Sequence, residues 1–251
     1  MDEDVRRLIQ FSCEGDRLIG TVDEALGTTG VLIVSGGNEV RSGAHRGMAL
    51  LAQRLAAGDV PVLRFDRRGI GDSQGSNGGY AASAPDIAAA LAAFRREQPH
   101  VTRVIGFGNC DAATALALLS DGFDALVLAN PWLGDEDAPP PPAALRNHYM
   151  RQVFRASAWR GAAKAGVSST IKTMAGAFAR PTEQPLTAQI AAALARRPTT
   201  VILATGDRTA QVFAAAVSMP EAVRVIRIDT ASHSFAGHVD ALERALIDAA
   251  R

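Results

Sequence analysis

The fold is decided by one stretch, Gly108-Asn109-Cys110-Asp111-Ala112. It joins the apolar run 101–107 to the Ala-rich run 112–119, a pattern typical of a buried strand that leads into a helix. Small residues two positions before and after a nucleophile allow the backbone to bend sharply without a clash. We therefore predict that Cys110 is a nucleophile on a strand-to-helix turn, in the place that serine more often takes.

Short apolar runs alternate with helical patterns along the chain. Apolar runs that are typical of central strands in a helix-covered parallel sheet are found at 30–34, 60–65, 102–107, 125–129 and 200–204. Helical patterns are found at 44–57, 83–96, 111–120, 209–217 and 235–250. At the start, 5–13 and 17–23 predict an antiparallel hairpin. The fold class is therefore α/β, a mostly parallel sheet with helices on both faces and functional loops at the carboxyl ends of the strands.

Two further residues complete a catalytic triad in the order nucleophile, acid, histidine. Asp207 follows the predicted strand 200–204, and His233 follows a predicted strand at 222–228. In this arrangement His233 takes the thiol proton and later protonates the leaving group, while Asp207 fixes the tautomer of the imidazole. Cys110 carries the acyl group as a thioester.

Each triad residue also has a structural alternative. A lone cysteine is most often a small buried hydrophobe, Asp207 is suited to capping the helix 209–217, and His233 is suited to capping the last helix. His238 is the second candidate for the base, because it lies about one and a half turns beyond His233. Gly71-Asp72-Ser73-Gln74-Gly75 matches the G-x-S-x-G string literally, but no strand leads straight into it and no helix follows it, so Ser73 is rejected as the nucleophile.

An oxyanion hole requires two N–H donors. We expect one from Asp111, the residue after the nucleophile, and one from Gly37 or Asn38, after the first central strand. The glycines of Ser35-Gly36-Gly37-Asn38 let the backbone come close to a substrate, and the alternative for this segment is a tight strand-to-helix connection.

Composition limits the remaining possibilities. The 251 residues with 47% hydrophobic content fit a single domain, 1–251, and the 26 basic and 26 acidic residues cancel, which gives no charge that would attract nucleic acid. No apolar stretch has the length of a membrane span. The two cysteines, Cys13 and Cys110, and a start without the features of a signal peptide predict a cytoplasmic, reduced protein. Metal and nucleotide motifs are missing from the sequence, so no cofactor is expected.

The segment 131–198 departs from the strand and helix alternation. It contains four consecutive prolines at 139–142, followed by scattered aromatic residues and a Gly/Ser/Lys-rich middle. We predict a helical insertion within the domain, the alternative being an ordinary pair of surface helices.

The motifs that carry a family resemblance are spread over nearly the whole chain: Phe11-Ser12-Cys13-Glu14-Gly15-Asp16, Gly36-Gly37, 41–46, 64–73, Cys110-Asp111, Asn130-Pro131-Trp132, Tyr149, Gly206-Asp207 and His233. With them the sequence resembles the first of the two α/β-hydrolase families associated with exosortase A, encoded beside bacterial exopolysaccharide and protein-sorting genes. More distantly it is similar to dienelactone hydrolases, which also use a cysteine. It departs from the family at Ala112, where the family has Gly, and at Asn38-Glu39, where the family has Pro-Gln.

The resemblance implies an α/β-hydrolase fold in which 131–198 is a lid over the nucleophile. It implies an esterase, thioesterase or acyltransferase that acts on a small acyl ester or thioester, with an acyl carrier or a polysaccharide precursor as an expected partner. Transfer and hydrolysis are not separated at this point, and the oligomeric state is left open. The alternative is a catalytically inactive hydrolase fold that serves as a binding or scaffold protein.

Overall fold

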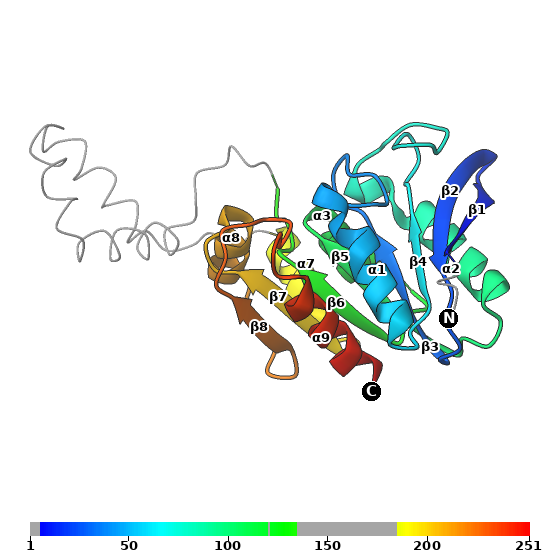
Figure 1. The fold of residues 1–251 in the computed structure, drawn as a ribbon. Coiled ribbons are helices and arrows are strands. Elements are labelled where there is room, and N and C mark those ends of the chain that lie inside the picture. Colours follow the sequence, from blue (N-terminus) through cyan, green and yellow to red (C-terminus); the bar gives the residue numbers. More distant parts are fainter. Residues whose placement is uncertain (1–5, 120, 135–184) are drawn as a thin grey trace, which may run out of the picture.

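The computed structural model describes residues 6–119, 121–134 and 185–251. Its strands are β1 (Arg6–Cys13), β2 (Asp16–Asp23), β3 (Thr29–Val34), β4 (Val62–Phe65), β5 (Arg103–Asn109), β6 (Ala125–Ala129), β7 (Thr199–Ala204) and β8 (Arg224–Ile228). Within these residues they form one eight-stranded sheet in the order β1-β2-β4-β3-β5-β6-β7-β8 (Figure 1). β2 pairs antiparallel with β1 and with β4, and all other pairs are parallel. The predicted hairpin and the mostly parallel sheet are both confirmed.

Helices cover both faces of the sheet. They are η1 (Ala44–Arg46), α1 (Gly47–Ala57), η2 (Tyr80–Ala82), α2 (Ala84–Glu97), α3 (Asp111–Leu119), α7 (Pro185–Leu194), α8 (Arg208–Ala216) and α9 (Val239–Ala250). α1 and α9 lie together on the face toward the viewer in Figure 1 and share one core with alternate strand residues such as Val31 and Ile33. α2, α3, α7 and α8 pack on the opposite face, where Leu32 and Val34 point. Side chains two residues apart share a face of a strand, which explains why these buried strands are apolar at every position.

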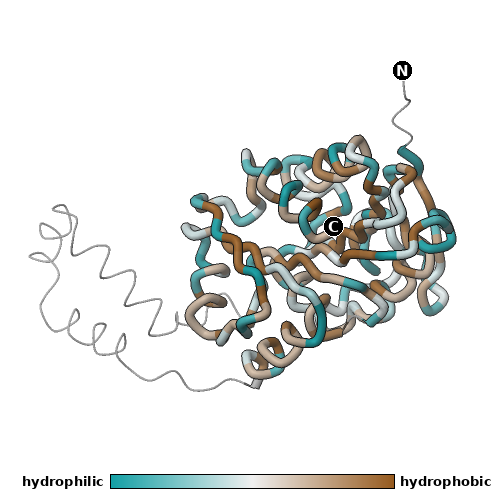
Figure 2. The backbone as a smooth tube through the Cα atoms, turned by 90° about the horizontal axis from the view of Figure 1, so that it is seen from below, coloured by the Kyte–Doolittle hydropathy of each residue, from teal (hydrophilic) through white to brown (hydrophobic). Residues whose placement is uncertain are grey.

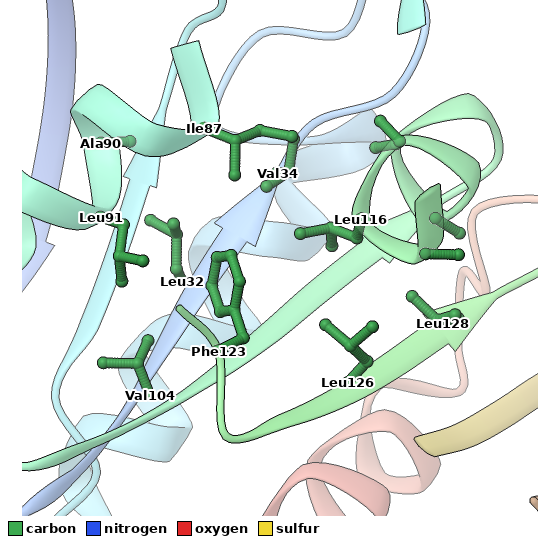
Figure 3. Close-up of a cluster of buried hydrophobic side chains, with 14 of the residues drawn as sticks. Leu32, Val34, Ile87, Ala90, Leu91, Val104, Leu116, Phe123, Leu126 and Leu128 are labelled. Carbon is green, nitrogen blue, oxygen red and sulfur yellow. The ribbon is translucent and has the colours of Figure 1, made fainter. Parts of the chain in front are cut away.

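The core on the second face is built around β3, β5 and β6. Figure 3 shows Leu32 and Val34 of β3 beneath Ile87 and Leu91 of α2, with Leu116 of α3 beside them. These side chains are almost wholly removed from water. In Figure 2 the hydrophobic segments run through the middle of the molecule. This packing fixes the position of β5 and therefore of the turn at its carboxyl end.

Two helix starts differ from the sequence prediction. The first helix begins with the short turn η1, in which His45 and Arg46 have positive φ, and only then continues as α1. The last helix begins at Val239 instead of 235, because Phe235 has a φ of 55° and cannot continue a helix. His238 therefore lies at the N-cap of α9 and not inside the helix.

The predicted insertion at 131–198 falls mostly on residues 135–184, which lie outside the described residues, so the lid stays a prediction. α7, near the end of this range, buries Ile190 and Leu194 in the core beside α3. Among the helices of the described ranges, none is long and apolar enough to cross a membrane.

Candidate active site

Cys110 lies on the predicted turn between β5 and α3. Its φ is 61°, in the left-handed region that side chains other than glycine rarely adopt. The N–H of Cys110 donates to the carbonyl of Ala129 at 3.0 Å, which ties the turn to the end of β6. A Cβ atom at Gly108 would lie 2.8 Å from the carbonyl carbon of Ala112, so the turn requires glycine at this position. The sharp strand-to-helix turn predicted from the sequence is confirmed, with the Cys110 side chain partly exposed on it.

Asp207 makes the contacts that both of its predicted roles require. It is the N-cap of α8, where its Oδ2 accepts the N–H of Ala210 at 3.0 Å. The same oxygen lies 3.1 Å from Nδ1 of His233. Burial acts to raise the pKa of Asp207, but the hydrogen bonds from His233 and from Ala210 together outweigh it, and the pKa lies below its ordinary value. A buried carboxylate is thereby held in its charged form beside the imidazole.

His233 connects Asp207 to Cys110. The hydrogen bond with Asp207 and a second side-chain hydrogen bond with Cys110 raise the pKa of His233 to about 10, against a smaller opposing effect of burial. His233 is therefore protonated at neutral pH. Cysteine attacks as a thiolate, so a nucleophilic cysteine requires a base or a positive charge nearby. The structure brings together all three residues of the predicted triad.

The loops that carry Asp207 and His233 are joined through their backbones. The N–H of Thr205 donates to Ile228 at 2.9 Å, and the N–H of Gly206 donates to Thr230 at 2.8 Å. A Cβ atom at Gly206 would lie 3.0 Å from the Cα of Ala231. The glycine therefore allows the two loops to approach closely enough for the ion pair to form.

The loop after β3 lies against the Cys110 turn, as the oxyanion prediction requires. A Cβ atom at Gly36 would meet the carbonyl oxygen of Asn109 at 2.5 Å and the Cβ of Cys110 at 3.4 Å. The N–H of Gly37 already donates to Oδ1 of the Asp111 side chain at 2.5 Å. The N–H of Asn38, by contrast, has no hydrogen-bond partner among the described residues.

Arg67, which the sequence did not mark as a site residue, connects the loop after β3 to the turn at Cys110. Its guanidinium donates to Ser83 Oγ at 2.8 Å, to the carbonyl of Gly37 at 2.7 Å and to Oδ2 of Asp111 at 3.3 Å. The Arg67 side chain is only 2% exposed. Its charge therefore balances the Asp111 carboxylate, and its hydrogen bond to Gly37 also holds the loop after β3 in place.

Two asparagines that contact His233 were also not predicted as site residues. Asn109 and Asn130 both donate from Nδ2 to the backbone carbonyl of His233, at 3.1 and 3.2 Å. Their positions could have indicated them as site residues, because each stands at or just after the end of a predicted strand. This is the edge of the sheet where the functional loops lie.

The rejected nucleophile, Ser73, has a structural role. The Ser73 hydroxyl is buried, donates to the carbonyl of Asp66 at 2.7 Å and accepts the N–H of Ile19 at 2.9 Å, which makes it a structural group. His45 lies on η1, His238 lies at the N-cap position of α9 without a side-chain capping hydrogen bond, and His148 lies outside the described residues. Both cysteines are free, and the described residues contain no group of three or more His, Cys, Asp or Glu that could hold a metal ion.

Comparisons with known proteins agree with this fold. The sequence profile of the Alpha/beta hydrolase family matches residues 31–245. A search of curated proteins found no match.

Solved structures share the fold over nearly the whole chain. An esterase from Pyrococcus furiosus is 14% identical with a TM-score of 0.64, and the match covers 97% of this chain and 89% of that one. An alpha-beta serine hydrolase homologue from Coxiella burnetii is 16% identical with a TM-score of 0.61, covering 96% of each chain. A hydrolase from Pseudomonas aeruginosa is 20% identical with a TM-score of 0.57, covering 98% of each chain. At these identities the similarity shows the fold alone.

Proposed function

The chain belongs to the alpha/beta hydrolase family, and from this membership we propose that it is an esterase, thioesterase or acyltransferase that works through a Cys110-His233-Asp207 triad. The observation that carries the proposal is the position of His233, whose Nδ1 lies 3.1 Å from the Asp207 carboxylate and which also interacts with the Cys110 side chain. The substrate class is a small acyl ester or thioester.

The reaction proceeds in two halves. The Cys110 thiolate adds to the acyl carbon and forms a tetrahedral oxyanion. When this intermediate collapses, the bond to the alcohol or thiol breaks, and the proton held by His233 passes to the leaving group. The acyl group then remains on Cys110 as a thioester. Water or a second acceptor, deprotonated by His233, attacks the thioester and releases the Cys110 thiolate, so transfer and hydrolysis share all steps except the identity of the acceptor.

The oxyanion hole is assigned to the N–H groups of Asp111 and Asn38. The Asp111 N–H lies at the start of α3, where backbone donors and the helix dipole favour an anion. Of the two candidates in the β3 loop, the Gly37 N–H is already bound to the Asp111 carboxylate, whereas the Asn38 N–H is not engaged among the described residues. This favours Asn38 as the second donor.

The family resemblance adds a cellular setting to this proposal. We place the protein in the cytoplasm of a bacterium with an exosortase and exopolysaccharide system, with an acyl carrier or a polysaccharide precursor as the acyl donor or acceptor. The support for this setting is the set of sequence motifs, from Gly36-Gly37 to His233.

The test is intact-mass analysis after incubation with a panel of acyl esters and thioesters, combined with turnover measurements. We expect an acyl adduct on the wild type and loss of adduct and turnover in Cys110→Ala. Cys13→Ala is the matched control. Burial and a hydrogen bond with Asp86 raise the pKa of Cys13 to about 11, so this thiol does not compete for reagents at neutral pH. Unchanged hydrolysis by Cys110→Ala would refute the triad, and an unreactive Cys110 in the folded wild type would favour the inactive scaffold.

A further inference from the structure

We propose that Asn109 and Asn130 are positioning residues that hold the His233 backbone in place for catalysis. Both side-chain amides donate to the same acceptor, the carbonyl oxygen of His233. Asn109 is the last residue of β5, directly before the nucleophile, and Asn130 directly follows the end of β6. The inference rests on the proposed function, because it assigns a task to residues around the base of that triad.

Asn130 connects the two loops that carry the acid and the base. Its Oδ1 accepts the N–H of Ala204 at 2.9 Å, at the end of β7 and three residues before Asp207. Its Nδ2 donates to His233, and its own N–H donates to Ile202 at 2.9 Å. The side chain is fully buried, and the φ of 41° is one that asparagine tolerates better than most residues. Both polar atoms of this side chain are therefore hydrogen-bonded, and these bonds fix the orientation of the amide.

Asn109 is kept in place at an energetic cost. Its side chain is 8% exposed, and its Oδ1 is buried with no hydrogen-bond partner among the described residues. A buried acceptor without a partner is unfavourable, so stability alone would favour an apolar side chain here. The favourable contribution that remains is the hydrogen bond that Asn109 Nδ2 donates to the His233 carbonyl.

The His233 carbonyl is therefore anchored to the ends of β5 and β6, and through Asn130 to the end of β7. Those three strands also position Cys110 and Asp207. Two bonds at one carbonyl oxygen limit how far the His233 backbone can drift from the sulfur. A displacement of about 1 Å in a catalytic group lowers turnover by up to about 100-fold.

The first test uses Asn130→Asp, which changes one atom. When the introduced carboxyl group is protonated, its O–H donates to His233 and its other oxygen still accepts from Ala204, as the amide does. When it ionises, it presents only acceptors to the carbonyl oxygen. We expect kcat of the variant to fall between about 10- and 100-fold relative to wild type at high pH, with KM unchanged and the ratio returning toward one as the pH is lowered. A role in folding alone would not produce this rescue by protonation.

The second test uses Asn109→Leu, which removes the donor together with the unpartnered acceptor. We expect kcat to fall while the midpoint of urea unfolding stays the same or rises. This variant decides the question even if Asn130→Asp does not fold. Gln10→Glu, an exposed amide-to-acid change on β1, is the control for added charge.

The outcomes separate the inference from the proposed function. Full turnover by Asn109→Leu, or a reduced kcat of Asn130→Asp that does not depend on pH relative to wild type, would overturn the inference while Cys110→Ala remains inactive. Turnover that persists in Cys110→Ala would instead overturn the proposed function.

Discussion

The carboxylate of Asp111 accepts the N–H of Gly37, which links the residue after Cys110 to the loop after β3. A carboxylate at this place is unfavourable for an oxyanion that forms nearby, unless its charge is balanced. Arg67 supplies the balancing charge, since its guanidinium contacts the other Asp111 oxygen and the Gly37 carbonyl. The loop, the turn and the arginine therefore form one unit, and the position of the proposed Asn38 donor depends on it.

Replacement of Arg67 tests this unit. Arg67→Met leaves the Asp111 carboxylate partly buried without its counter-charge, and we expect the free energy of unfolding to fall by about 3–5 kcal/mol. Asp111→Asn keeps an acceptor for Gly37 but removes the charge, so the double variant should recover much of the loss. Urea unfolding of the two single variants and the double variant measures the coupling. Losses that simply add would contradict a shared ion pair.

The glycines of the loop give a matched pair of variants. Gly36→Ala places a methyl group 2.5 Å from the Asn109 carbonyl oxygen, so the loop must move away from the Cys110 turn. We expect kcat to fall by about tenfold or more. Gly37→Ala meets no atom within 4 Å, and its cost is the positive φ of 53°, which is about 1–2 kcal/mol of stability. Esterase kinetics and thermal unfolding of both variants separate the effects, and a larger kcat loss in Gly37→Ala than in Gly36→Ala would contradict this account.

The sequence predicted the parts of the fold and site that depend on local pattern. The apolar runs gave the central strands, because a strand covered on both faces excludes polar residues wherever it is buried. The turn at Cys110 followed from the small residues at Gly108 and Ala112. Asp207 and His233 followed from the order of residues at strand ends, and the structure brings His233 to both Asp207 and Cys110.

What the sequence did not reveal depends on contacts between distant segments. Arg67 is one of several charged residues in the segment 64–73, and only the fold shows that it is buried against Gly37 and Asp111. Asn130 has no helical or strand period to mark it, and its role comes from an acceptor 103 positions away. The late start of α9 was missed because the positive φ of Phe235 leaves no trace in hydrophobic periodicity.

Asp207 offers a way to separate capping from catalysis. Asp207→Asn keeps an acceptor for the Ala210 N–H but loses the charge that stabilises the His233 imidazolium. We expect kcat/KM to fall by about 100-fold or more, with little change in stability. Asp207→Ala removes both contacts and should cost a further 0.5–2 kcal/mol, roughly the value of a helix N-cap. Ester turnover and urea unfolding of the two variants provide the comparison, and equal stability losses would show that the cap does not contribute.

The ion pair between His233 and Asp207 gives the stability a defined pH dependence. The pKa of His233 is raised from 6.5 to about 10 on folding, so its contribution is complete below pH 6.5 and is lost as the pH rises toward 10. The pKa of Asp207 is lowered from 3.8, so its contribution is present above that pH and is lost as the pH falls below it. The pair therefore stabilises most between pH 3.8 and pH 6.5.

Urea unfolding of wild type and His233→Gln across this range measures the effect, because the difference between the two proteins cancels the titration of groups that do not interact with His233. The His233 side chain is 39% exposed, so solvent screening makes the energy of the pair smaller than its pKa shift alone would imply. The difference should be largest near pH 5 and should shrink steadily toward about pH 10. A difference that grows with pH over this range would mean that His233 is neutral in the folded protein, and His233 would then have to take up a proton during the reaction before it could pass one to the leaving group.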